Sequence, residues 1–219
     1  MALPRISLIH ATPLAIDPVV EAFTREWPEA EVCNLLEDSL ASDLARDGEI
    51  TPAMTGRFVH LANYVRDNGA DAILFTCSAF GASIEAAAQA LAPVPVLKPN
   101  QAMFEDAIRQ SKKIGMVATF APSIPSMERE FTEMAAGTGA VLRSACADGA
   151  MAVLGAGDGP GHDRMVGEMA RTLEDVDIIL MAQFSTARAR NLVEDLTGKP
   201  VLTSPDSAVH KMRRLLEAK

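Results

Sequence analysis

The chain has 219 residues, with 20 basic and 29 acidic side chains and a formal net charge of −9. This charge argues against binding to nucleic acid or to an anionic membrane surface, because both require basic patches. Apolar residues make up 48% of the chain and aromatic residues only 5%, so the core must be largely aliphatic, as in helices packed on parallel strands. Since we find neither a signal-like start nor an apolar segment long enough to span a bilayer, we expect a cytoplasmic protein.

The first half of the chain alternates short apolar runs with segments that carry apolar residues at helical spacing. This alternation is typical of strands and helices that follow each other in an α/β fold. Polar residues end each apolar run, and in open α/β sheets such breaks lie at the carboxyl edge, where ligands bind. We predict strands at 5–10, 31–36, 72–75 and 95–97, helices at 18–27, 52–68, 84–91 and 100–110, the last capped by Asn100, and a surface excursion with a helical piece at 41–51.

The second half repeats this alternation. Its glycine-rich segment 149–161 lacks the lysine of a phosphate-binding loop and is not a GxGxxG motif between a strand and a helix, so we interpret it as a flexible loop. Thr119 to Ser126 form a loop rich in hydroxyl side chains. We predict strands at 113–118, 141–145, 177–181 and 200–202, and helices at 127–136, 162–174, 184–196 and 206–216.

The two halves are related by sequence. Residues 71–91 and 177–196 share an order of Asp, apolar strand, polar break and helix, and Gln183 falls where Cys77 falls. Such a long period indicates a doubled domain rather than a short-repeat solenoid. We therefore predict an α/β fold of two similar Rossmann-like lobes with parallel sheets related by pseudo-two-fold symmetry, with 1–98 plus 204–219 in the first lobe, 99–203 in the second and the active cleft between them.

Cys77 lies at the break between a strand and a helix. Backbone N–H groups at a helix start stabilise negative charge, so we expect its pKa to lie below the free value of about 8.5 and its thiol to react fastest. The alternative is a small hydrophobic residue that closes the strand end, since free cysteine is often buried. The three cysteines are an odd number without CxxC or CxxxC spacing, which disfavours a disulfide framework and a zinc site. We expect Cys33 and Cys146 to be spectators, and no metal or other cofactor.

These residues carry a resemblance to a known family. The two α/β halves, the Cys77-Ser78 pair and the hydroxyl loop that opens the second half together resemble the aspartate/glutamate/hydantoin racemase superfamily over essentially the whole chain. The resemblance implies a cofactor-free enzyme in which one cysteine removes a proton next to a carboxylate and a second cysteine returns it on the opposite face. It also implies that Ser78 is a hydrogen-bond donor to the substrate, that Thr119 and Ser123 hold its carboxylate, and that Thr12 is the symmetry mate of this loop.

The departure from the family pattern is Gln183, which stands where the second cysteine belongs. An amide cannot deliver a proton at neutral pH, but it can donate and accept hydrogen bonds and so hold a carboxylate or carbonyl group. Ser185 lies close by in sequence, although an unactivated hydroxyl is a poor proton donor. His10 titrates near neutrality at the end of the first strand and is the most plausible substitute acid, with a structural role at the sheet edge as the alternative.

Three classes of function remain open. The first is an isomerase, either racemase-like or similar to maleate isomerases in which a cysteine adds to a double bond. The second is a single-cysteine lyase that resembles arylmalonate decarboxylase. The third is a binding protein for small carboxylates without catalysis, against which the intact Cys77 argues. We expect a small carboxylate as substrate and a homodimer as the assembly.

Overall fold

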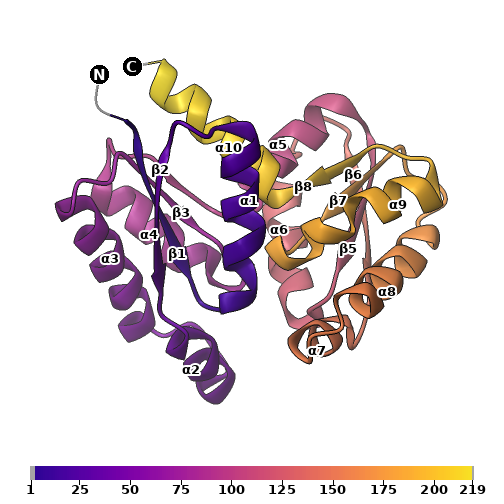
Figure 1. Cartoon of the computed structure of the whole chain (residues 1–219), viewed down its shortest axis with the longest axis horizontal. Helices are drawn as coiled ribbons and strands as arrows, with labels where there is room; N and C mark the ends of the chain where they lie inside the picture. Colours follow the sequence, from indigo (N-terminus) through magenta and orange to yellow (C-terminus); the bar gives the residue numbers. More distant parts are fainter. Residues whose placement is uncertain (1–2, 219) are drawn as a thin grey trace. The chain divides into compact units, whose positions relative to one another are not determined.

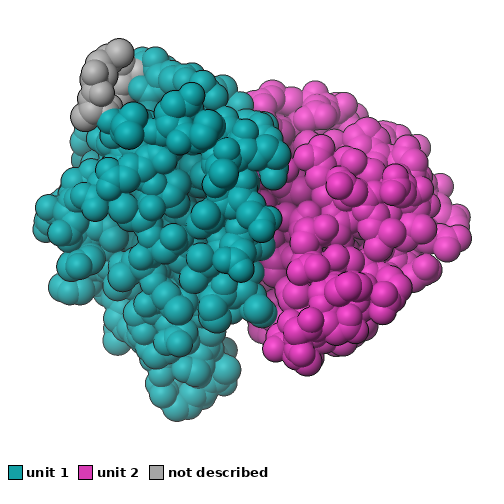
Figure 2. Space-filling model, in the orientation of Figure 1, with its two compact units in different colours: residues 1–99, 208–219 teal, residues 100–207 magenta. Residues whose placement is uncertain are grey.

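A computed structural model describes residues 3–218 of the chain. The chain divides into two compact units (Figure 2). The first contains the residues up to 99 together with those from 208 onward, and the second contains residues 100–207. Each unit holds one four-stranded sheet whose strand pairs are all parallel. The predicted α/β class with two similar lobes is confirmed.

The first unit is built on a sheet of order β2-β1-β3-β4. Helix α1 lies on one face of the sheet, and α3 and α4 lie on the other (Figure 1). Aromatic rings of Phe58, Phe75 and Phe80 pack between α3, β3 and the turn after it, with ring centroids 4.9–5.1 Å apart. The elements are β1 (Arg5–His10), α1 (Ile16–Glu26), β2 (Glu31–Leu36), α2 (Ser39–Asp47), α3 (Pro52–Asp67), β3 (Ala72–Phe75), α4 (Gly81–Leu91) and β4 (Val96–Leu97).

The second unit repeats the plan with the order β6-β5-β7-β8. Side chains alternate along its strands: Ile178 and Leu180 join the core under α5 and α6, whereas Ile179 and Met181 join the core under α8 and α9. A strand buried on both faces must be apolar at every position, which is why this segment reads as a continuous apolar run. The elements are α5 (Gln101–Gln110), β5 (Lys113–Ala118), α6 (Ile124–Met134), β6 (Val141–Cys146), α7 (Ala150–Gly155), α8 (Gly159–Arg171), β7 (Ile178–Met181), α9 (Arg190–Thr197) and β8 (Val201–Thr203). The last helix, α10 (Ser204–Glu217), begins in the second unit and continues in the first.

Four 3₁₀ helices follow the strands at the carboxyl edges of the two sheets. The α-helices that follow three of them, α1, α4 and α6, begin two or three residues before the predicted starts. Two of the 3₁₀ helices begin directly after the residues of most interest, Cys77 and Gln183. Because a 3₁₀ turn is tighter than an α turn, it can close the sharp reversal from strand to helix. These helices are η1 (Pro13–Ala15), η2 (Ser78–Phe80), η3 (Ala121–Ser123) and η4 (Phe184–Ala189).

The glycine-rich segment of the second half is helical, so the prediction of a flexible loop at 149–161 is wrong. Gly149 and Gly157 take positive φ angles of 81° and 89° and mark the boundaries of α7 rather than a flexible loop. Asp158 then caps α8, accepting a hydrogen bond from the backbone N–H of Gly161 at 2.8 Å. The glycines serve helix ends, where left-handed backbone and a cap are needed.

Asn100 precedes α5 as predicted, but its side chain makes no capping hydrogen bond. The side chain is fully buried, and its Oδ1 lies 2.6 Å from the hydroxyl of Ser204 at the start of α10. Asn100 therefore links the starts of two helices, because a buried amide takes the partner that tertiary packing offers. Among residues 3–218 we find no helix with the length and apolarity to cross a bilayer.

Candidate active site

Cys77 lies at the carboxyl edge of the first sheet. It is the second residue after β3 and the N-cap position of η2, in extended backbone (φ −118°, ψ 119°), and its side chain is half-buried against the core. Burial raises the pKa of the Cys77 thiol, whereas the backbone N–H of Ala79 acts in the opposite direction. The expected lowering of this pKa is therefore wrong, because the loss of hydration destabilises the thiolate more than a single N–H group stabilises it. At neutral pH Cys77 carries its proton.

His10 ends β1 and is completely buried. Its Nδ1 lies 2.9 Å from the hydroxyl of Thr76, and its Nε2 lies 2.9 Å from the side-chain oxygen of Asn34. A neutral ring satisfies both partners if Nε2 donates to Asn34 and Nδ1 accepts from Thr76. Burial lowers the pKa of His10, against the effect of its bond to Asn34. These contacts favour the structural alternative, since the ring ties β1 to the neighbouring strand β2 and to the residue after β3.

The remaining predicted residues of the first unit lie at the same edge. Thr12 caps η1, and its hydroxyl accepts from the backbone N–H of Leu14 at 3.4 Å. Ser78 opens η2 directly after Cys77 and is half-buried. The carboxyl ends of β1 and β3 thus place Thr12, Cys77 and Ser78 at one edge of one sheet, as parallel pairing requires.

A charged network that the sequence did not reveal covers the carboxyl end of β2. Arg57 on α3 donates to Asp43 at 2.5 Å and to the hydroxyl of Ser39 at 2.6 Å, and it also pairs with Glu37. The side chains of Arg57, Glu37 and Asp43 are only 35%, 27% and 21% exposed. The network ties α2 and the end of β2 to α3. The acidic residues after the strand were visible in the sequence, but their arginine partner was not.

We expect Arg57→Ala to lower the free energy of unfolding by about 1–2 kcal/mol, because it removes the partly buried cation that Glu37 and Asp43 share and leaves Asp43 with Arg46 alone. Urea denaturation of the variant and the native protein measures this change. Arg46→Ala is the matched control, since Arg46 pairs with Asp43 and Asp47 while its side chain is 68% exposed. Equal effects of the two substitutions would show that the buried network contributes nothing beyond a surface ion pair.

In the second unit, Gln183 occupies the position that corresponds to Cys77. Cys77 is the second residue after β3, and Gln183 is the second residue after β7. Each of these strands pairs with the first strand of its own unit in the same register, since Ile6 is aligned with Ala72 and Ile114 with Ile178. Gln183 is also an N-cap in extended backbone, with φ −109° and ψ 151°. The strand registers confirm the correspondence between the two positions that the sequence repeat indicated.

The Gln183 amide is held by the hydroxyl loop of its own unit. Its Oε1 accepts from the backbone N–H of Thr119 at 2.9 Å and from the Thr119 hydroxyl at 3.4 Å. Its Nε2 donates to the hydroxyl of Ser123 at 3.1 Å, and that hydroxyl donates to the backbone oxygen of Phe120 at 2.8 Å. Thr119 and Ser123 are 5% and 2% exposed. The fold thus joins three of the predicted site residues in one buried cluster.

The position equivalent to Thr119 in the first unit is Ala11 and not Thr12. β1 ends at His10 and β5 ends at Ala118, so Ala11 and Thr119 are the residues that follow these two strands. The difference is the one-residue offset between the two sequence blocks.

Ser185, the last of the predicted site residues, is buried within η4. It lies next to Thr186, whose hydroxyl donates to the backbone oxygen of Gln183 at 2.6 Å. The turn that carries Ser185 therefore begins at Gln183 and is closed by the neighbouring threonine.

Comparison with known proteins identifies the family. The sequence model described as Asp/Glu/hydantoin racemase matches residues 16–175, more than half of the chain. The chain belongs to the Asp/Glu/hydantoin racemase family. A comparison with curated protein sequences gave no match.

Solved structures of two racemases and a decarboxylase have a similar fold. Glutamate racemase RacE1 from Bacillus anthracis is 17% identical, with a TM-score of 0.76 over 100% of this chain and 83% of that chain. Aspartate racemase from Picrophilus torridus is 12% identical, with a TM-score of 0.73 over 95% of this chain and 94% of that chain. Unliganded arylmalonate decarboxylase is 18% identical, with a TM-score of 0.64 over 97% and 92%. At these identities the likeness establishes the fold alone.

The other two cysteines of this racemase-family chain have distinct surroundings. Cys146 donates to the carboxylate of Asp148 at 3.2 Å, and burial together with that carboxylate raises its pKa to about 11. Cys33 is half-buried on β2, and its sulfur accepts from the guanidinium of Arg5 at 3.3 Å. The same sulfur lies 3.9 Å from the carboxylate of Glu31, to which the thiol can donate. Cys33 thus lies between a cation and a carboxylate, whereas Cys77 is buried against the core.

We expect iodoacetamide at pH 7 to modify Cys33 faster than Cys77, since burial raises the pKa of the Cys77 thiol and thereby lowers the fraction present as reactive thiolate. Peptide mapping by mass spectrometry gives both rates. The rate at Cys77 should climb as the pH is raised toward its elevated pKa, because the thiolate is populated only there. Faster labelling of Cys77 at pH 7 would show that its thiolate is stabilised despite burial.

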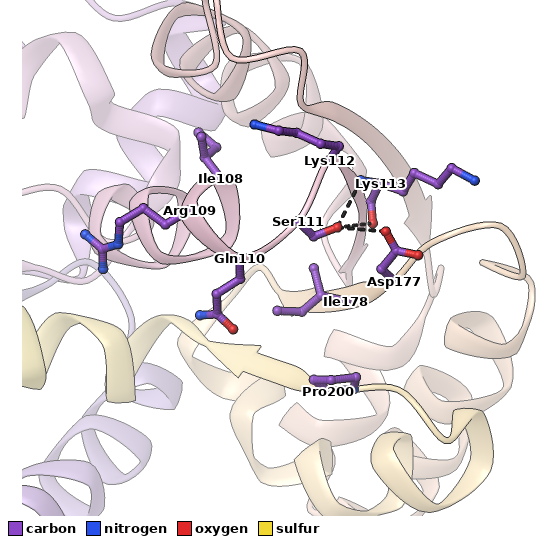
Figure 3. Close-up of a pocket in the computed structure, with 9 residues that line it drawn as sticks. All are labelled: Ile108, Arg109, Gln110, Ser111, Lys112, Lys113, Asp177, Ile178 and Pro200. Atoms are coloured by element: carbon purple, nitrogen blue, oxygen red, sulfur yellow. Dashed lines mark hydrogen bonds between the residues drawn. The ribbon is translucent and has the colours of Figure 1, made fainter.

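A cavity of about 550 Å³ lies elsewhere on the second unit (Figure 3). It opens where β5, β7 and β8 begin, so it lies at the sheet edge opposite Gln183. The Ser111 hydroxyl bridges Asp177 and the backbone of Lys113 beside it. Ligands of open α/β sheets bind at the carboxyl edge, and the cavity is therefore separate from the candidate active site. It is lined by Ile108, Arg109, Gln110, Ser111, Lys112, Lys113, Asp177, Ile178 and Pro200.

Proposed function

We propose that the protein is a cofactor-independent enzyme, of the isomerase type found in its family, that transfers a proton at the carbon next to a carboxylate of a small acid. The observation that carries the proposal is Cys77, a half-buried thiol at the carboxyl edge of the first sheet in a racemase-family chain. Two structural relatives are named as racemases of glutamate and aspartate. Small amino acids and related carboxylates are therefore the substrates to test first.

The protonation state of the Cys77 thiol determines how it transfers a proton to the substrate. Because burial keeps the thiol protonated at neutral pH, the isomerase reaction begins when solvent takes the Cys77 proton. The thiolate removes the α-proton of the substrate and becomes a thiol. This S–H group then returns a proton to the carbanion, and the resulting thiolate recovers a proton from solvent. A proton donor is most effective when its pKa lies near the working pH. A substrate that brings hydrogen-bond donors or excludes water changes this pKa further, so the raised pKa of Cys77 is a property of the unliganded protein.

A second candidate function is a decarboxylation with proton return from one side, as the name of one structural relative suggests. The observation that favours it is Gln183, which stands in the position equivalent to Cys77 and has no proton to give at neutral pH. In this reaction the substrate loses carbon dioxide, the electron pair remains on the carbon, and Cys77 protonates that carbon. The thiolate is again restored by solvent.

Deuterium incorporation tests both candidates. The native protein is incubated in deuterated water with aspartate, glutamate, a hydantoin and an arylmalonate, and proton NMR follows the α-position of each. Exchange without loss of carbon dioxide supports the isomerase, and a deuterated product with release of carbon dioxide supports the lyase. If none of the four classes is exchanged or decarboxylated, a wider carboxylate panel that also fails would contradict the proposal and support a binding protein.

A further inference from the structure

The Gln183 amide occupies a site built for a carboxylate oxygen. Two donors of Thr119, its backbone N–H and its hydroxyl, converge on the single Oε1 atom at 2.9 Å and 3.4 Å. Thr119 is 5% exposed, so in the absence of another acceptor these donors would be buried without a partner. Convergent N–H and O–H donors in a water-poor site are the usual means of binding an anionic oxygen.

Ser123 holds the amide in this position. Its hydroxyl proton is directed to the backbone oxygen of Phe120 at 2.8 Å, which leaves its lone pair to accept from Gln183 Nε2 at 3.1 Å. Ser123 therefore acts as an anchor for the glutamine rather than as a donor to an external anion. The amide is fixed at both ends, and Oε1 is presented to Thr119.

We propose that the Gln183 side chain is an internal ligand of this oxyanion site, and that a small carboxylate binds at Thr119 by displacing it. The inference rests on the proposed function for the class of ligand, a carboxylate of small size. A charged acceptor makes stronger hydrogen bonds than a neutral amide, while the tethered amide has the advantage of high local concentration. Gln183 thereby restricts the site to carboxylates that bind Thr119 more strongly than the tethered amide does.

The consequence for affinity can be measured directly. If the site is open in only a fraction of the molecules, the apparent dissociation constant is raised by the inverse of that fraction. Removing the amide should remove this competition. Gln183→Ala deletes a fragment with the size and shape of acetamide, so acetate is its charged isostere and acetamide its neutral equivalent.

The experiment uses the full-length protein labelled with ¹⁵N, in a Cys77→Ala background so that no chemistry is required. Acetate and acetamide are titrated while the Thr119 backbone amide is followed by NMR. We expect Gln183→Ala to bind acetate at Thr119 about tenfold more tightly or better than the protein with Gln183, and acetamide to bind only the variant. Gln110→Ala, at an exposed glutamine of the same unit, is the matched control and should not change either titration.

Equal acetate affinity with and without the Gln183 amide would overturn the inference, as would acetate binding that leaves Thr119 unperturbed. Gln183→Glu is the second variant and remains informative if Gln183→Ala does not fold. Its carboxylate should occupy the site permanently, shift the Thr119 amide proton downfield and weaken acetate binding about tenfold or more; unchanged acetate binding in this variant would equally contradict the internal ligand. Since binding is read without turnover, failure of the proposed reaction and failure of this inference are separate results.

Discussion

Cys77→Ala is expected to reduce the turnover number by about a thousandfold, within the range that a positioned acid or base contributes. The physical reason is that no other side chain described at the carboxyl edge of the first sheet has a proton to give near neutral pH. Thr12 caps η1, and His10 is buried with both ring nitrogens bonded. Steady-state kinetics on the substrate found by deuterium exchange measures the loss.

Cys146→Ala is the matched control for this substitution. Cys146 also has a raised pKa, yet it is the last residue of β6, an edge strand of the second sheet, and it bonds to Asp148. Its removal should leave the turnover number within a factor of about two, the scale of an ordinary surface change. Retention of activity in Cys77→Ala would remove the thiol from the mechanism and return attention to His10.

Gln183→Cys is expected to convert one-sided proton transfer into two-sided transfer. With a single thiol, a carbanion is protonated from the side of Cys77, and the product is one enantiomer. In the two-cysteine mechanism that the family resemblance implies, a thiol at the position equivalent to Cys77 supplies the second acid, so both enantiomers should exchange their α-proton with deuterated water. Chiral chromatography and mass spectrometry of the products give both quantities.

Gln183→Ala separates the gain of a thiol from the loss of the amide. Both substitutions release Thr119 and Ser123 from Gln183, but only cysteine adds a proton donor, so only Gln183→Cys should yield two-sided exchange. A native protein that racemises aspartate, glutamate or a hydantoin efficiently would support the proposed isomerase but contradict proton return from the Cys77 side alone. It would require another acid, for which His10 would be the first candidate despite its burial.

The order of strands and helices followed from local pattern. β1, β3 and β5 lie where the sequence predicts them, because a strand that is buried on both faces of a parallel sheet is mostly apolar along its length. Helix starts were less accurate: α1 and α6 begin two or three residues earlier than predicted, because the boundary between a 3₁₀ turn and the α-helix after it has no strong composition signal. The glycines of 149–161 were misinterpreted because the same residue serves both loops and helix ends.

By itself, the sequence determined the doubled α/β plan, the place of Cys77 at the end of a strand and the glutamine in the equivalent place, since each depends on periodicity and order along the chain. Only the tertiary structure decided which side chains meet. His10 has Asn34 and Thr76 as partners, and Gln183 has Thr119 and Ser123. These partners lie between 24 and 66 residues away along the chain. The pKa of Cys77 also depends on the tertiary structure, because the energy of a charge is set by the water and the dipoles around it, and no single stretch of sequence contains these.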